Sequence, residues 1–122
     1  MLNIGGRDWE LVFNLDAIDQ MEKRFKAKLD SKSITETMGD RQKLVALLYV
    51  LAEQGEALNG REIDVDERWF ARRITLGKLP QVQTEILAAI SDGMKMETEE
   101  PNEDEEVDVV LDEIKKKETP EG

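Results

Sequence analysis

The segment KLVALLYVLAEQGE, residues 43–56, decides the fold of this chain. Leucines recur through it at helical spacing, and valine, alanine and tyrosine make the other sides apolar too. A helix that is apolar nearly all round must be covered on several sides by other elements. We therefore expect a central helix over residues 41–53, with Asp40 as its N-cap and Gly55 as its stop signal.

Four further segments on either side of the central helix carry helical signals. Each begins at or just after a residue that suits a helix N-terminus, namely Asn14, Ser33, Asp66 and Pro80. Apolar residues then follow at helical spacing, and glycines at positions 39, 77 and 93 mark the ends. The expected helices cover residues 15–27, 33–39 (a short turn), 66–75 and 80–92.

The N-terminal segment has the pattern of a β-hairpin over residues 2–13. Gly5-Gly6 supplies a turn, and the large apolar residues after it alternate with others at a period of two: Trp9, Leu11 and Phe13. Two strands alone are marginal in water, so this hairpin must lie on the helices. The predicted fold is mainly α (α+β), with the hairpin packed on a bundle of about four short helices.

The charge divides the chain into two parts. The net charge is −11, and residues 97–122 account for −9 of it. Residues 1–95 are therefore expected to form one globular hairpin-plus-helices domain, and residues 96–122 a flexible, disordered acidic tail. Within the tail, a possible short amphipathic helix covers residues 107–117, with an apolar face formed by Val107, Val110, Leu111 and Ile114.

The composition argues against an enzyme. The chain contains no histidine and no cysteine, which removes the commonest general base, the commonest metal ligand and any thiol nucleophile. The acidic residues Asp64, Asp66 and Glu67 could suggest a cation site, but the calcium-loop pattern is missing and a capped helix N-terminus explains them. We expect no catalytic residue, no cofactor and no metal.

The same composition argues against nucleic acid and membrane as partners. Arginines beside Trp69-Phe70 could stack on bases, yet the strong negative charge of the whole chain repels phosphate backbones. No run of 18 apolar residues is present. The first six residues also lack the pattern of a signal peptide, so the cytosol is the expected compartment.

The order of segments resembles the tail assembly chaperones of long-tailed, non-contractile bacteriophages and related prophages. The resemblance covers about residues 2–94 and rests on four stretches: NIGGRDWELVFNLDAIDQMEKRF, KLVALLYVLAEQGE, DVDERWFARRI and LPQVQTEILAAISDGM. In that family a hairpin leads into a basic-ended first helix, and a central apolar helix with a tyrosine precedes a short capped helix and a closing helix. Trp69-Phe70 departs from the family, which has aliphatic or acidic residues at the short helix.

The resemblance implies a function and a place of action. Such chaperones coat the aggregation-prone tape-measure protein in the host cell cytoplasm until tail-tube subunits polymerise around it, and they are absent from the mature virion. It therefore implies the tape-measure protein as the partner, with the tail-tube protein as a second candidate. Self-association into a homo-oligomer is also open.

Seven apolar residues are candidates for binding the partner. Large aromatic residues suit interface anchoring, and the apolar face of the tail helix suits docking in a groove. The candidates are Phe25, Tyr49, Trp69, Phe70, Val110, Leu111 and Ile114. Core packing for the four aromatics and a merely solubilising tail are the competing interpretations. A small acidic regulator that mimics DNA and binds a host enzyme is the alternative function.

Overall fold

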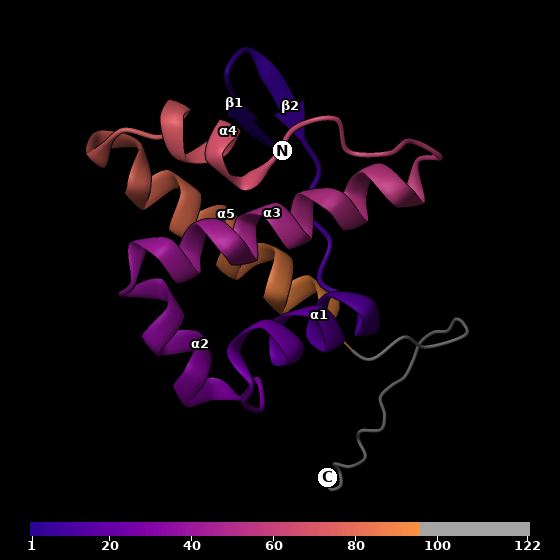
Figure 1. The fold of residues 1–122 in the computed structure, drawn as a ribbon, viewed down its shortest axis with the longest axis vertical. Helices are drawn as coiled ribbons and strands as arrows, with labels where there is room; N and C mark the ends of the chain where they lie inside the picture. The colour runs from indigo at the N-terminus through magenta and orange to yellow at the C-terminus, as the bar shows by residue number, and fades with distance from the viewer. Residues whose placement is uncertain (96–122) are drawn as a thin grey trace, which may run out of the picture.

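A computed structural model of the chain describes residues 1–95. It is mainly helical with an N-terminal antiparallel hairpin, which confirms the predicted fold class (Figure 1). The predicted tail and its helix over residues 107–117 lie outside the described residues. The elements are β1 Leu2–Ile4, β2 Arg7–Trp9, α1 Leu15–Phe25, α2 Ser31–Met38, α3 Arg41–Leu58, α4 Glu67–Arg73, the 3₁₀ helix η1 Leu76–Lys78 and α5 Leu79–Gly93.

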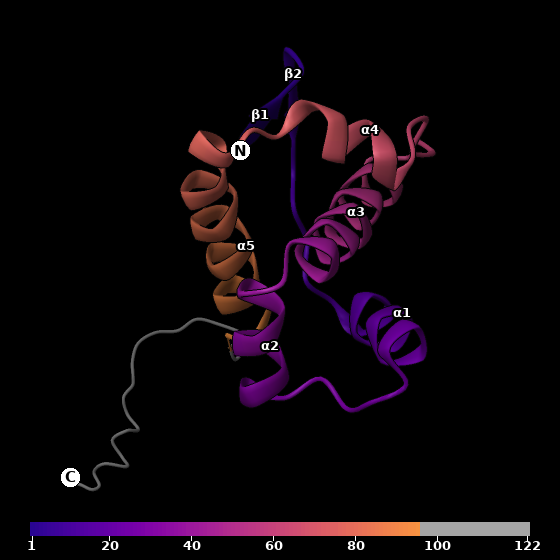
Figure 2. The same ribbon diagram turned by 60° about the vertical axis from the view of Figure 1, so that its left-hand side comes forward.

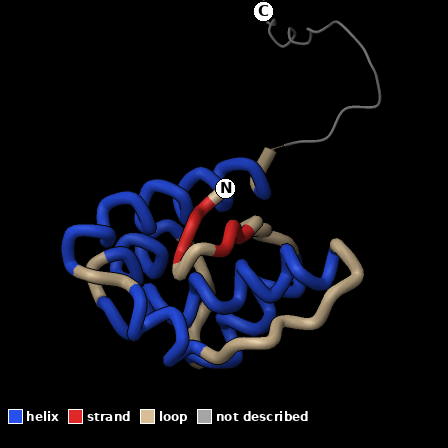
Figure 3. Tube along the Cα trace, turned by 90° about the horizontal axis from the view of Figure 1, so that it is seen from above, coloured by secondary structure: helices blue, strands red, loops and turns tan. Residues whose placement is uncertain are grey.

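The central position predicted for α3 is confirmed. It packs against α1, α2, α4 and α5, and its buried leucines form the middle of the hydrophobic core. The side chains of Trp9, Met21, Phe70 and Ile86 come to these leucines from other elements and are fully or almost fully buried. Figure 3 looks down on the short hairpin, which lies at one end of the molecule in Figure 1. None of the helices in residues 1–95 combines the length and the apolar character that a membrane span requires.

The hairpin is shorter than the sequence predicts. β1 pairs with β2 from Leu2 opposite Trp9 to Ile4 opposite Arg7, and the strand pattern ends there. Residues 10–13 instead run as an extended segment between α3 and α5 (Figure 2). The backbone N–H of Val12 donates to the carbonyl oxygen of Leu51 in α3, at 3.1 Å. The alternation continues past Trp9 because Phe13 still faces the core, although no strand among residues 1–95 pairs with it.

Two glycines allow this segment to pass between the helices. A Cβ atom on Gly55 would lie 1.9 Å from the carbonyl oxygen of Glu10, and one on Gly93 would lie 2.1 Å from that of Phe13. Real atoms cannot approach so closely, so both positions require glycine, which has no side chain. The prediction that Gly55 stops the central helix near residue 53 is therefore wrong: α3 continues to Leu58.

Of the five predicted helix starts, three caps are confirmed and one is corrected, while Pro80 lies in the first turn of α5 as expected. Asn14 accepts from the backbone of Ala17, and Asp40 and Asp66 cap α3 and α4 in the same way. Helix α2, however, begins at Ser31 because Asp30 is its N-cap. Ser33, predicted as the cap, is instead the third helical residue and completes a capping box with Asp30.

Candidate partner-binding groove

An aromatic cluster fixes α4 against the hairpin and α3. The ring of Phe70 packs edge to face against three others, with centroid distances of 5.0 Å to Trp9, 5.2 Å to Trp69 and 6.3 Å to Tyr49. Its side chain is fully buried. Such edge-to-face pairs add about 0.5–1.5 kcal/mol each beyond the burial of area. Trp69 and Phe70, in the middle of this short helix, therefore hold α4 in place.

Trp69 lies at the border of this cluster and is covered rather than free. The guanidinium carbon of Arg73 lies 4.2 Å from the centroid of its ring, and Arg73 also donates to the Trp69 carbonyl oxygen at 3.1 Å. The turn of the hairpin covers another edge, because a Cβ atom on Gly5 would lie 2.9 Å from Trp69 Cη2. Gly5 has a φ of +64°, so the turn needs glycine for its backbone as well.

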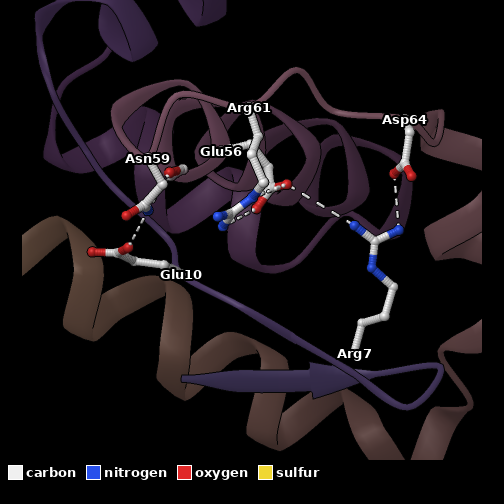
Figure 4. A network of polar contacts seen from close by, with 7 residues as sticks. Arg7, Glu10, Glu56, Asn59, Arg61 and Asp64 are labelled. Atoms are coloured by element: carbon white, nitrogen blue, oxygen red, sulfur yellow. Dashed lines mark hydrogen bonds and ion pairs between the residues drawn. The ribbon is translucent and has the colours of Figure 1, made fainter.

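A polar network holds the loop that leads from α3 to α4 (Figure 4). The buried carboxylate of Glu56 accepts two hydrogen bonds from Arg61, both 3.1 Å, while Arg7 of the hairpin lies 4.0 Å away. Arg7 donates to Asp64 at 2.8 Å. The hydrogen bonds from Arg61 hold the pKa of the Glu56 carboxyl below its usual value. The network thus ties the loop to both the hairpin and α3.

The acidic residues before α4 serve this framework. Asp66 is the N-cap, and Glu67 in the first turn forms an ion pair with Arg24 of α1. Asp64 pairs with Arg7, and the hydrogen bond from Arg7 lowers its pKa. In residues 1–95 no cluster of three or more potential metal ligands occurs. The carboxylates therefore act in capping and in ion pairs that join elements.

Helix α4, η1 and the adjoining ends of α3 and α5 enclose an open groove of about 620 Å³. Its lining is mostly apolar, and Leu76 in η1 is 71% exposed. An exposed leucine at the lip of an apolar hollow is a typical feature of a binding surface. The apolar residues of the lining are Val45, Ala71, Ile74, Leu76 and Leu79.

The rim of the groove carries positive charge. Arg41 at the start of α3 and Arg68 in α4 both line it, and neither takes part in an ion pair within residues 1–95. The carboxylate in the lining belongs to Glu67, which Arg24 already neutralises. An occupant with an apolar face and acidic flanks would therefore fit both the lining and the rim.

The aromatic residues predicted to bind a partner lie outside this groove. Phe70 is fully buried in the cluster with Trp9 and Trp69, as the competing interpretation of core packing expects for this residue. Partner binding by the aromatic candidates stays a prediction. Tyr49, Trp69 and Phe25 are half-buried. The ammonium of Lys43 lies 5.4 Å from the centroid of the Phe25 ring.

Tyr49 lines a smaller hollow beside the groove, of about 310 Å³. Arg24, Asp66, Glu67 and Arg68 are its other neighbours there. Burial raises the pKa of the Tyr49 hydroxyl, and the carboxylates of Glu53 and Glu67 add to the effect. This side chain remains neutral at physiological pH, as a packing residue would.

The groove residues were not predicted from the sequence. Their signal is the run Ile74, Leu76 and Leu79, three large apolar residues around Gly77 that belong to no single helical period. The remaining predicted binding residues, Val110, Leu111 and Ile114, lie outside the described residues. Comparison with protein-family models, with curated proteins and with solved structures finds no match to this chain.

Proposed function

We propose that this chain is a non-enzymatic tail assembly chaperone, which binds the tape-measure protein of a long-tailed bacteriophage and keeps it soluble before the tail tube polymerises. Two observations support the proposal. The order and character of the segments in residues 2–94 resemble that family. The open apolar groove beside α4 is the structural observation that carries it.

The groove suits a helical client. An amphipathic helix lays its apolar face into such a groove, with anchors at every third or fourth residue. Leu76 would become buried on binding, and full burial of a leucine contributes about 2 kcal/mol. Replacing it with an aspartate should therefore weaken binding by roughly 30-fold or more.

Co-expression with the tape-measure protein tests the function. The soluble fraction of the tape-measure protein should rise with the wild-type chain and fall again with Leu76→Asp. Leu58→Asp is the matched control, because Leu58 is similarly exposed (67% against 71%) but lies at the far end of α3. A tape-measure protein that is equally insoluble with and without the wild-type chain contradicts the proposal.

The place of action is part of the same proposal. A chaperone that leaves before assembly is completed acts in the host cytoplasm and is missing from the mature particle. Mass spectrometry should therefore detect the chain in infected-cell lysate and not in purified virions. Recovery in virions at a fixed ratio to the tail-tube protein would instead make it a structural component.

Two arginines on the rim, which form no ion pair with any residue of 1–95, weigh against the alternative of a DNA mimic. A mimic needs carboxylates arranged on a folded surface, whereas the open groove presents Arg41 and Arg68. Most of the net negative charge lies in residues 97–122. A groove of this character matches an apolar helix with acidic flanks better than it matches a basic enzyme surface.

A further inference from the structure

The chain contains a segment whose chemistry matches the groove. We infer that residues 107–114 dock in the groove of the same molecule as an amphipathic helix, and so cover it in the free protein. The inference concerns the chain alone and does not depend on the identity of the client. It rests on the apolar lining, the charge of the rim and the length of chain between Lys95 and the segment.

The apolar residues of the segment fall on one side of a helix. At 100° per residue, Val107, Val110, Leu111 and Ile114 lie within about 100° of one another, and Val109 points to the opposite side. This stripe is two turns long. It matches the apolar lining formed by Ile74, Leu76 and Leu79 together with Val45 of α3 and Ala71 of α4.

The charges are complementary as well. Asp108, Asp112 and Glu113 flank the apolar stripe of the segment. Arg41 and Arg68 on the rim form no ion pair within residues 1–95, so they can receive carboxylates without giving up an existing partner. Each such contact at a partly exposed site adds only a few tenths of a kcal/mol, so the apolar face supplies the larger share.

The connection is long enough to reach. Twelve residue steps separate Lys95 from Val107, which span about 40 Å when extended and about 19 Å as a random coil. The groove is lined by Leu79 at the start of α5, and the 15 residues of that helix cover about 22 Å. A tether of this length gives an effective concentration in the millimolar range, so even a weak contact is populated.

A second hollow lies closer to Lys95 but has the wrong charge. It has a volume of about 810 Å³ and is lined by Leu15, Ile18 and Lys95 among others. Lys95 is already paired with Asp92 at 3.0 Å, and Asp16 and Asp19 adjoin the lining residues in α1. An acidic segment would be repelled there, which leaves the groove beside α4 as the docking site.

Paramagnetic relaxation in the full chain tests the inference. Because the chain has no cysteine, Glu118→Cys carries a single nitroxide just beyond the segment. The methyl signals of Ile74 and Leu76 should be lost with the nitroxide oxidised and recovered on reduction. Those of Leu58, at the far end of α3, should persist in both states. Unchanged signals at Ile74 and Leu76 overturn the inference.

Two matched variants and a mixing control identify the contact. Leu111→Asp in the labelled chain should restore the methyl signals, whereas Val109→Asp, with the same change of charge on the opposite side of the helix, should not. An equal response to both variants overturns docking through the apolar stripe. Signal loss in an unlabelled chain mixed with the labelled one would show contact between molecules, which overturns docking within one chain. No client is present, so failure here leaves the proposed function standing.

Discussion

Substituting Gly55 with alanine separates two physical effects that have opposite signs. Helix propensity alone predicts that Gly55→Ala, in the last turn of the long helix α3, stabilises the protein by up to about 1 kcal/mol. The structure predicts the reverse, because the new Cβ atom would lie 1.9 Å from the carbonyl oxygen of Glu10. The position of a Cβ atom is fixed by the helix backbone, and the oxygen belongs to the backbone of Glu10, so no side-chain rotation can relieve the overlap.

The expected loss follows from the contacts of the displaced segment. Overpacking of a closed interior costs about 1–3 kcal/mol, and at this distance the upper end applies. Pushing residues 10–13 away from α3 also weakens the hydrogen bond from Val12 to Leu51, which contributes about 1 kcal/mol. After subtraction of the propensity gain, the free energy of unfolding should fall by about 2–3 kcal/mol.

Urea unfolding followed by circular dichroism measures this change. A loss of about 2 kcal/mol corresponds to a fall in melting temperature of about 8–16 °C for a domain of this size. Gly39→Ala is the control, since a Cβ atom there meets only an ordinary contact of 3.7 Å and should change stability little. A Gly55→Ala protein as stable as the wild type, or more stable, would refute the close passage between α3 and α5.

Three further changes test other parts of the framework. Hydrogen bonds from Arg61 lower the pKa of the Glu56 carboxyl below its ordinary value of 4.5, so the carboxylate stabilises the folded state above that pH and this stabilisation is lost as the pH falls. Glu56→Gln should therefore flatten the decline in the free energy of unfolding between about pH 5 and 3. Phe70→Ala removes a fully buried ring from the aromatic cluster and should cost about 3–5 kcal/mol in urea unfolding. Asn14→Ala removes the cap of α1 and its bond to Gln54, so thermal unfolding should show a loss of about 1 kcal/mol or more.

Local chemistry in the sequence predicts the helices well. Asn14, Asp40 and Asp66 each hydrogen-bond the backbone two or three residues further on, and this signal depends on no distant contact. The central position of α3 is equally predictable from the sequence, because a helix that is apolar on all sides must be buried in the core. Ser33 was assigned the wrong role because Asp30 and Ser33 are both residues that suit an N-cap, and the helix begins after the earlier one, Asp30.

Contacts between distant residues account for the remaining errors. Gly55 has the sequence signature of a helix end, and only the approach of Glu10, 45 positions earlier, shows why it stays helical. The alternation of Trp9 and Phe13 marks residues that face the core, but it does not show whether their backbone pairs with a strand or with Leu51 of a helix.

The groove shows the same limit at the functional level. The groove lies between α4, η1 and the ends of α3 and α5, so it depends on how these elements pack and cannot be predicted from any single stretch of sequence. Aromatic side chains were the natural candidates for binding, yet Phe70 is buried by neighbours from three elements. The exposed Leu76 follows a helix that ends earlier than its glycine signal suggests.

Chemical-shift mapping with the client tests the central claim most directly. The methyl signals of the full chain would be recorded while a helical segment of the tape-measure protein is added. We predict that the signals of Ile74, Leu76 and Leu79 shift together, and that those of Leu15 and Leu58, which are exposed elsewhere on the surface, do not. Shifts confined to Leu15 and Leu58, with the groove signals unmoved at saturation, would contradict it.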